Sequence, residues 1–397
     1  MKAQATWLDK YFRGDRVIWL IVFILSIFSL LAVYSSTGTL AYKYQQGNTE
    51  YYLLKHLGIL LLGLGLMYGA SLVRYTLYSR ISQIALLLAI PLLGVTLAMG
   101  TNLNEASRWL TLPVINLSFQ TSDFAKLALI MYVARTLSKK QDNIKDFKSA
   151  FLPIIIPVLI VCALILPANL STAAVLFMTC VFLMFIGRIN MKYIGYMAGI
   201  GALCLTLFIT IALVSGKKGR VETWKARIEN FTKGGEDVNY QTQQAKIAIA
   251  SGGILGKMPG NSTQRNFLPH PYSDFIYAII TEEYGFVGAA LIIFLYILLF
   301  YRVIRFVTKN PRAFGTLLAI GCTFMLIFQA MINMAVATNI FPVTGQPLPL
   351  VSMGGTSLWF TSISIGIILS VSRDVEKETE ENKIEKKEEG GVELAAA

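Results

Sequence analysis

The chain has 397 residues, of which 55% are hydrophobic and only 15% are charged. A soluble domain carries about 25% charged residues, so the composition excludes an ordinary soluble globular protein. The formal net charge is +12, but the basic residues lie mainly in short segments between apolar blocks, without an aromatic-basic binding platform. The sequence therefore predicts no nucleic-acid partner and indicates contacts with membrane lipids instead.

In chain order, ten apolar blocks predict ten membrane-spanning helices. About twenty apolar residues in a helix cross a hydrocarbon core of about 30 Å. The predicted fold class is an all-α membrane protein with one large extracytoplasmic loop, residues 215–274, between the seventh and eighth spans. The expected spans are residues 17–33, 53–73, 81–99, 124–137, 151–166, 170–187, 193–214, 275–301, 314–336 and 356–371.

Around the membrane domain, residues 17–372, the sequence predicts two cytoplasmic tails, residues 1–16 and 373–397. The second tail is charged and has no apolar face to bury, so we expect it to be disordered or a fraying helix. Lys and Arg gather in the first tail and in alternate short loops, which predicts that both termini are cytoplasmic. The outer loop nevertheless holds nine basic residues, for which an anionic ligand is one explanation.

Asp274 lies in the segment 268–275, which leads into the eighth span. Asp is a common N-cap residue, and the prolines before it suit a helix start, so capping is one interpretation. The other interpretation is a carboxylate at the membrane surface, facing a basic loop, that serves as a general base. The residues alone leave both interpretations open.

Glu282 and Glu283 lie about two turns further along the same span. Adjacent acids inside a membrane are costly unless they are paired, so we expect buried pairing with a neighbouring basic or polar group rather than direct catalysis. Gln120 and Ser352 are further polar residues expected in or beside the membrane. Lys126 follows Asp123 by three positions, where a salt bridge is the simplest expectation.

Arg108 and Trp109 precede the fourth span, where they either anchor the chain at the interface or clamp a phosphate. Lys257 lies in a glycine-rich run that lacks the ending of a Walker loop, so a flexible loop is favoured. The stretch 339–357 is largely apolar yet holds three prolines and three glycines. Irregular backbone at membrane depth survives only where protein buries it or where it lines a cavity. We therefore predict a re-entrant segment that shapes a groove for substrate or lipid.

Together these features resemble the SEDS family of shape, elongation, division and sporulation proteins, which includes FtsW, RodA and SpoVE. The resemblance extends from Asp15 to Val371. Its ordered motifs are Asp15-Arg16, Tyr34-Ser35-Ser36, Ala106-Ser107-Arg108-Trp109, Gln120 to Lys126, Tyr240-Gln241, Ser251-Gly252-Gly253, Ser273-Asp274-Phe275, Glu282-Glu283 and Pro342 to Gly355. The chain departs from the family pattern at Asn169 and His270, where acids are common, and at Met258, where glycine is usual.

The resemblance implies a peptidoglycan glycosyltransferase of the bacterial cytoplasmic membrane, which polymerises lipid II into glycan strands and releases undecaprenyl pyrophosphate. The implied partners are lipid II, undecaprenyl-linked glycan, a class B penicillin-binding protein and other divisome proteins. The compact length and the short N-terminal tail favour the FtsW-like division branch, and hence the division septum. A RodA-like role in elongation stays an alternative.

In the implied reaction, an α-linked pyrophosphate donor gives a β-1,4 glycan by a single inverting displacement. The acid of the family's Ser/Thr-Asp-Phe motif falls on Asp274, which would be the base for the acceptor hydroxyl. A divalent cation such as Mg²⁺ could share the charge of the leaving group, although the sequence identifies no metal ligands. A lipid II flippase, without chemistry, is the alternative function. The residues expected to contact the substrate are Arg108, Trp109, Lys126, Arg227, Lys257 and Ser262. The cations among them would stabilise the negative charge of the leaving group.

Overall fold

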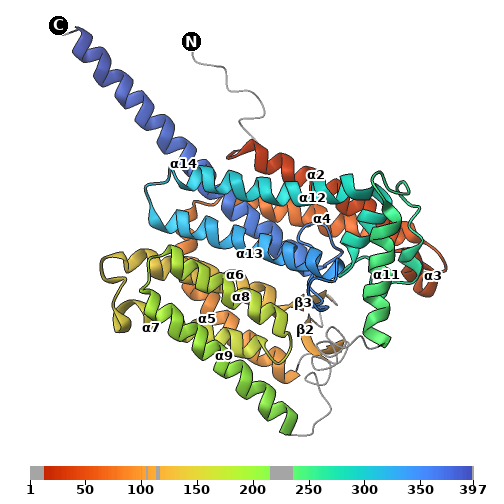
Figure 1. Cartoon of the computed structure of the whole chain (residues 1–397). Helices are drawn as coiled ribbons and strands as arrows, with labels where there is room; N and C mark the ends of the chain where they lie inside the picture. The colour runs from red at the N-terminus through yellow and green to blue at the C-terminus, as the bar shows by residue number, and fades with distance from the viewer. Residues whose placement is uncertain (1–12, 100, 104–105, 113–116, 215–235, 396–397) are drawn as a thin grey trace.

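The computed structural model describes residues 13–99, 101–103, 106–112, 117–214 and 236–395. This part of the chain is predominantly helical, and its long helices run side by side in one bundle (Figure 1). A helix is found at each of the ten predicted spans. These helices are α2 (Arg16–Ser36), α4 (Thr49–Leu72), α5 (Tyr75–Met99), α6 (Thr121–Lys139), α7 (Leu152–Ile165), α8 (Leu170–Ile186), α9 (Met191–Val214), α12 (Ile276–Val307), α13 (Ala313–Ala337) and α14 (Thr356–Ala395).

Within the described residues, seven helices are long and apolar enough to cross a membrane, and α8 is a shorter apolar helix. The predicted class, a helical membrane protein, is therefore confirmed, while the number of ten spans stays a prediction. The helix α6 carries two buried charged residues, Asp123 and Lys126, and it contacts α5, α7, α8, α13 and α14. Because protein surrounds it, α6 can hold charges that a lipid-facing helix could not.

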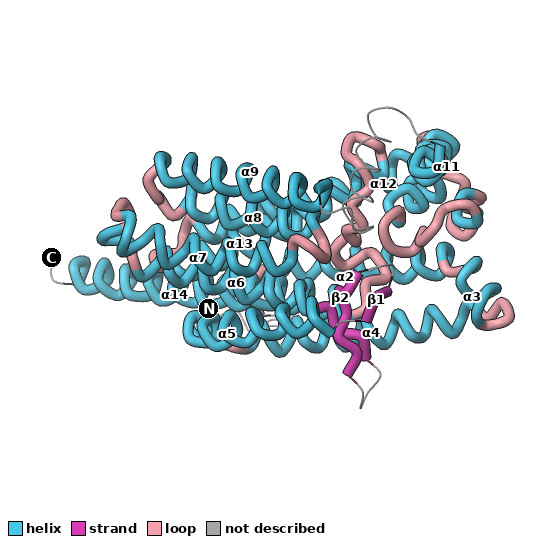
Figure 2. Tube along the Cα trace, turned by 90° about the horizontal axis from the view of Figure 1, so that it is seen from below, coloured by secondary structure: helices cyan, strands magenta, loops and turns pink. Residues whose placement is uncertain are grey.

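One small sheet and two helices lie where only loops were expected. Between α5 and α6, the strands β1 (Thr101–Leu103), β2 (Ala106–Leu112) and β3 (Leu117–Gln120) pair in an antiparallel sheet. The sheet satisfies backbone groups outside the helices, and strands this short give no clear hydropathy signal. The helices α3 (Gly38–Tyr44) and α11 (Glu236–Gly252) are the other two additions. All of them gather toward one end of the molecule (Figure 2), which we call the outer end, following the predicted topology.

At the opposite end, the start of α2 meets α12 and α14. The carboxylate of Asp15 caps α2 by accepting from the N–H of Val17 at 2.8 Å, and its other oxygen lies 2.6 Å from the guanidinium of Arg302. The backbone N–H of Asp15 donates to Ser372 Oγ at 3.1 Å. Residues 373–395, for which composition favoured disorder or a fraying helix, continue α14 as a helix.

Candidate active site

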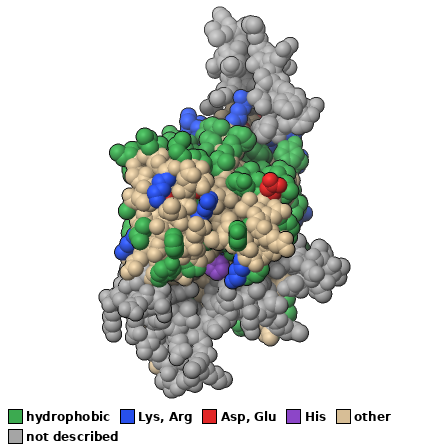
Figure 3. Space-filling model, turned by 90° about the vertical axis from the view of Figure 1, so that its right-hand side faces the viewer, with side chains coloured by type: hydrophobic (Ala, Val, Ile, Leu, Met, Phe, Trp, Pro, Cys, Tyr) green, Lys and Arg blue, Asp and Glu red, His purple; other side chains and the backbone are tan. Residues whose placement is uncertain are grey.

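A cavity of about 700 Å³ opens at the outer end of the bundle. It lies where α4, the start of α6, the loop before α12 and the loop between α13 and α14 come together. This end of the molecule shows scattered Lys and Arg side chains on a mixed polar and apolar surface (Figure 3). The ionisable and amide side chains that line the cavity are Lys55, Gln120, Asp123, Lys126, Asn169, Gln241, His270, Tyr272, Asp274 and Gln346.

Asp274 does not cap the helix that follows it. The helix α12 begins at Ile276, and its N-cap residue is Phe275, without a side-chain hydrogen bond. The carboxylate of Asp274 instead accepts from Ser273 Oγ at 2.9 Å and lines the cavity. A side chain at Gly345 would place its Cβ 3.5 Å from Asp274 Oδ2. Asp274 is therefore not the N-cap residue of α12, and its side chain is part of the cavity wall.

The backbone around Asp274 is tied to the loop between α13 and α14. Asn333 Nδ2 donates to the carbonyl oxygen of Asp274 at 2.9 Å and to that of Gln346 at 2.7 Å. Ser352 Oγ donates to the carbonyl oxygen of Ser273 at 2.6 Å. Asn333 and Ser352 are both buried, so these bonds are shielded from water and hold the carboxylate in a defined position.

Replacing Asn333 by Ala is expected to lower the turnover number about tenfold to hundredfold while changing KM little. The substitution leaves two buried carbonyl oxygens without a donor and lets Asp274 shift, and a displacement of about 1 Å can cost about 10²-fold in rate. Steady-state kinetics on purified protein measures the effect. Ser364→Ala is the matched control, since its hydroxyl donates only within α14, to Phe360 O. If the turnover number of Asn333→Ala falls no more than that of Ser364→Ala, Asn333 does not position Asp274.

The loop between α13 and α14 was predicted to shape a groove, and the structure confirms that it lines the cavity. Residues 343–347 and 353–355 contribute to the wall. The loop has no regular secondary structure, so side chains of the helices bind its carbonyl groups. Gln329 Nε2 donates to Pro347 O at 2.9 Å, Tyr296 OH to Pro349 O at 2.5 Å, and Ser29 Oγ to Val351 O at 2.9 Å.

Lys126 and Asp123 form the predicted salt bridge, with Lys126 Nζ 2.7 Å from Asp123 Oδ1. Both side chains are almost fully buried, at 9% and 3% exposure, and both line the cavity. Lys126 Nζ also donates to Gln329 Oε1 at 3.5 Å, while Asp123 Oδ2 is buried and accepts no hydrogen bond from the part of the chain that the structure describes. A cation held this rigidly at a cavity wall costs little reorganisation when a negative charge develops beside it.

Two titratable side chains, His270 and Tyr272, precede Asp274 on the same loop. His270 Nδ1 lies 3.1 Å from Tyr272 OH, and both residues line the cavity. Burial, with the Asp274 carboxylate adding to it, raises the pKa of the Tyr272 phenol. Tyr272 therefore keeps its proton at neutral pH and can donate a hydrogen bond.

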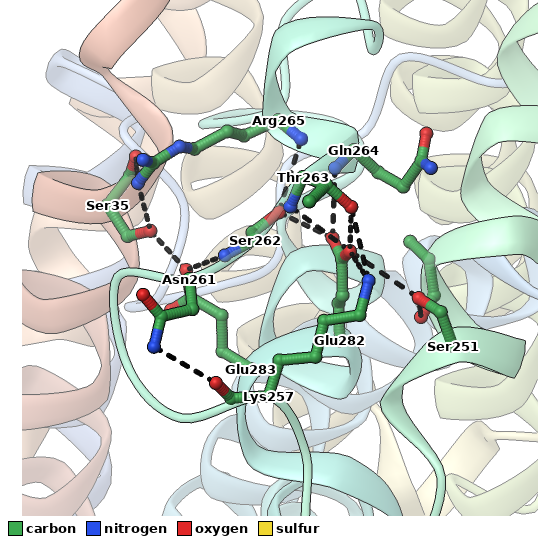
Figure 4. A network of polar contacts seen from close by, with 11 residues as sticks. Ser35, Ser251, Lys257, Asn261, Ser262, Thr263, Gln264, Arg265, Glu282 and Glu283 are labelled. Carbon is green, nitrogen blue, oxygen red and sulfur yellow. Dashed lines mark hydrogen bonds and ion pairs between the residues drawn. The ribbon is translucent and has the colours of Figure 1, made fainter.

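Glu282 lies outside this cavity, in a separate buried network at the outer end (Figure 4). Its Oε1 is 2.7 Å from Lys257 Nζ and accepts from Thr263 Oγ1 at 2.8 Å. Its Oε2 accepts from Ser262 Oγ and from the N–H of Gln264. The expected pairing of a buried acid with a basic group is confirmed for Glu282. Lys257 and Ser262, predicted as substrate contacts, are held by this carboxylate instead and do not line the cavity.

Glu283 binds Ser262 as well, and it also binds the end of α2. Its Oε1 accepts from Ser35 Oγ at the end of α2 and from the N–H of Ser262 at 3.3 Å. Arg265 Nη1 in turn donates to the carbonyl oxygen of Ser35 at 3.0 Å (Figure 4). The two acids thus attach residues 257–265 to α12 and α2, which is a structural role.

The glycine-rich run favoured as a flexible loop is packed against a kink of α12. Phe286 N donates to Gly253 O at 2.9 Å, and Lys257 N donates to Glu282 O at 2.9 Å. Gly285 has φ +66°, and a Cβ there would lie 2.3 Å from Ile254 O. Only glycine fits this contact, so the kink and the loop require each other.

Met258 has φ +75° and a side chain that is 66% exposed. The left-handed region costs a residue with a side chain about 1–2 kcal/mol, and little burial compensates here. Met258→Gly is therefore expected to raise the free energy of unfolding by about 1 kcal/mol. Thermal unfolding in detergent measures the change. Gly260→Ala is the opposite control, since Gly260 has φ +81° with open space around it, and it should lower stability. An unchanged or lower midpoint of thermal unfolding for Met258→Gly would contradict the proposed backbone strain at Met258.

For three of the predicted substrate contacts, the structure does not describe the side chain. Arg227 lies outside the described residues. Arg108 and Trp109 are described only through the backbone of β2, where Trp109 pairs with the cavity residue Gln120 of β3. Gln120 itself donates from Nε2 to Ser122 Oγ at 3.0 Å. Sequence patterns missed Lys55 and Asn333, because neither belongs to a recognisable motif: Lys55 lies beside His56 near the start of α4, and Asn333 lies one turn after Gln329 in the largely apolar α13.

Fold and cavity together define a multi-pass membrane protein with a polar site at one end of its helices. The chain belongs to the FtsW/RodA/SpoVE family of cell cycle proteins, since the family model matches residues 15–377. Among curated relatives, the "Probable peptidoglycan glycosyltransferase FtsW" of Geobacter sulfurreducens is 33% identical over 365 residues, covering 91% of this chain and 95% of that protein. The "Stage V sporulation protein E" of Bacillus subtilis is 31% identical over 366 residues, covering 90% and 97%.

Solved structures share the same fold. One chain, from a structure described as "Structural coordination of polymerization and crosslinking by a peptidoglycan synthase complex", superposes with a TM-score of 0.69 at 26% identity, covering 91% of this chain and 98% of that chain. The rod shape determining protein RodA of Thermus thermophilus gives a TM-score of 0.66 at 23% identity, covering 92% and 98%.

Proposed function

We propose that this protein is a peptidoglycan glycosyltransferase that polymerises lipid II and releases undecaprenyl pyrophosphate. The observation that carries the proposal is a single cavity that holds both a carboxylate, Asp274, and a rigid buried cation, Lys126. An inverting transfer needs these two groups, a base for the acceptor and a positive charge for the leaving group. Support comes from relatives that are named peptidoglycan glycosyltransferase.

In this mechanism Asp274 takes the proton of the acceptor 4-hydroxyl as that oxygen attacks the anomeric carbon of the donor. The bond to the pyrophosphate oxygen breaks in the same step, and its negative charge develops beside Lys126, with Lys55 as a second cation of the cavity. The volume of about 700 Å³ is within the usual range of ligand sites, about 300–1,000 Å³. It suits the saccharide and pyrophosphate, while the polyprenyl tails stay among the lipids.

The setting of the reaction follows from the topology. The contact between Asp15 and Ser372 brings the first and last helices to one end, which supports termini on the same, cytoplasmic side and a site on the outer face of the cytoplasmic membrane. A penicillin-binding protein of class B is the proposed partner, supported by the fold shared with a chain of a peptidoglycan synthase complex. Similarity to proteins named FtsW supports action with other divisome proteins at the septum.

A divalent cation is proposed to bind together with the substrate rather than in a site of its own. No cluster of three or more His, Cys, Asp or Glu side chains occurs among the residues that were placed. Mg²⁺ commonly uses one or two carboxylates plus substrate phosphates, and Asp123 and Asp274 line the cavity. Chelation by EDTA should therefore slow polymerisation, and added Mg²⁺ should restore it. A polymerisation rate that EDTA does not change would exclude a requirement for a divalent cation.

The function is tested with the full chain and its partner in proteoliposomes that contain fluorescent lipid II. We expect a ladder of glycan products on a gel, formed on the face where the cavity opens. Lipid II that crosses the bilayer without any ladder, with every partner and cation tested, would contradict the proposal and support the flippase.

A further inference from the structure

A second cavity, of about 360 Å³, lies at the end of the bundle opposite to Asp274. The helix α12 connects the two sites, because its 32 residues extend over about 48 Å. The cavity is formed by the start of α2, the last turns of α12 and the part of α14 beyond residue 372. Its charged lining side chains are Asp15, Arg302, Arg305, Lys309 and Glu376.

The positive charges of this cavity are not all used by the protein. Arg302 is held by Asp15, with guanidinium to carboxylate distances of 2.6 and 2.8 Å. Arg305 and Lys309 follow on the same face of the helix, four residues apart, and both are exposed. Neither has a salt bridge among the residues placed in the structure. Three cations against the carboxylates of Asp15 and Glu376 leave the lining with a net positive charge, and Arg305 and Lys309 are the two cations that can bind an anion.

The position along α12 indicates which kind of anion fits. Phe294, Ile297 and Tyr301 expose 55%, 59% and 57% of their side chains, as expected of a face in contact with lipid tails. Tyrosine marks the boundary of the hydrocarbon region, and the basic residues begin directly after it. The cavity thus lies at the level of the lipid head groups, and Phe306 and Val375 give it an apolar floor.

We propose that this cavity binds the head group of an anionic phospholipid. Arg305 and Lys309 bind the phosphodiester, Phe306 and Val375 contact the glycerol, and the acyl chains continue along the exposed apolar face of α12. Basic pockets between membrane helices on the cytoplasmic side are typical sites for such head groups. The inference does not depend on the proposed glycosyl transfer, since none of these residues lies at the cavity of Asp274.

The test is native mass spectrometry of the full chain with phosphatidylglycerol or phosphatidylcholine. The protein should retain phosphatidylglycerol in preference to phosphatidylcholine. The variant with Arg305→Gln and Lys309→Gln should bind it about twentyfold more weakly, because each basic residue near a membrane surface contributes about fivefold. The matched control, Lys139→Gln with Lys140→Gln, removes two exposed cations of α6 and its C-cap that do not line the cavity and should bind normally.

Three results would overturn the proposal. The first is equal retention of phosphatidylglycerol by the double variant and the control, with both variants keeping the unfolding midpoint of the parent. The second is equal retention of the two lipids. The third is displacement of the lipid by millimolar inorganic phosphate, which would indicate a site for a free anion. Arg302 stays unchanged throughout because it supports the cap of α2.

Discussion

An Asp274→Asn protein should lose about 10²–10⁴-fold of its polymerisation rate, since positioned general bases contribute factors of that size. The amide has nearly the shape of the carboxylate, so it keeps the contact with Ser273 Oγ but cannot accept the acceptor's proton. KM should change little, because the cations that hold the pyrophosphate remain. The measurement is the initial rate of glycan formation by purified protein with its partner.

The fold should not suffer from this substitution, since the N-cap residue of α12 is Phe275 and an amide can keep the contacts of a carboxylate of the same shape. The unfolding midpoint and partner binding are therefore expected to stay at the parent values. Asp142→Asn, an exposed acid in the 3₁₀ turn after α6, is the control for loss of one negative charge and should be fully active. A rate for Asp274→Asn within twofold of the parent would exclude Asp274 as the base.

Lys126→Met should lower both stability and activity. Removing the cation leaves the buried carboxylate of Asp123 without its partner, which costs about 3–5 kcal/mol. Loss of a fixed charge beside a developing oxyanion lowers the rate about 10²–10³-fold. Thermal unfolding and the polymerisation assay, run on the same preparation, give the two quantities.

A double variant separates the two effects of this change. Lys126→Met with Asp123→Asn removes both charges, and replacing a buried ion pair is often close to neutral for stability. We expect the unfolding midpoint to recover most of its loss while the rate stays low. Recovery of the rate together with the midpoint would show that Lys126 acts only as a structural partner of Asp123.

The sequence predicted the long helices well, because apolar blocks of span length have few alternative structures in a membrane. It also predicted the ion pair of Lys126, which needs only helical spacing. The sheet β1–β3 was missed, since its pairing depends on contacts between short segments. The role of Asp274 remained open from local pattern, because capping and catalysis favour the same residue at a helix start.

Two of the predicted substrate contacts lie away from the cavity, and this too has a physical explanation. Lys257 and Ser262 lie in a glycine-rich loop, a pattern that suits anion binding, but the ligand is the protein's own Glu282. That contact requires the kink at Gly285, which brings the loop against α12. Asn333 was missed for a different reason: the amides of Asn333 and Gln329 bind carbonyl groups of the loop between α13 and α14, and these contacts exist only once that loop is folded.

The central claim is that the cavity between Asp274 and Lys126 holds the reacting part of lipid II. The most direct measurement is a cryo-electron microscopy map of the Asp274→Asn protein, in complex with its partner and lipid II. We expect density for the pyrophosphate beside Lys126 and for a sugar ring beside residue 274. Density for the pyrophosphate at the Glu282 network, with the cavity empty of substrate, would contradict it.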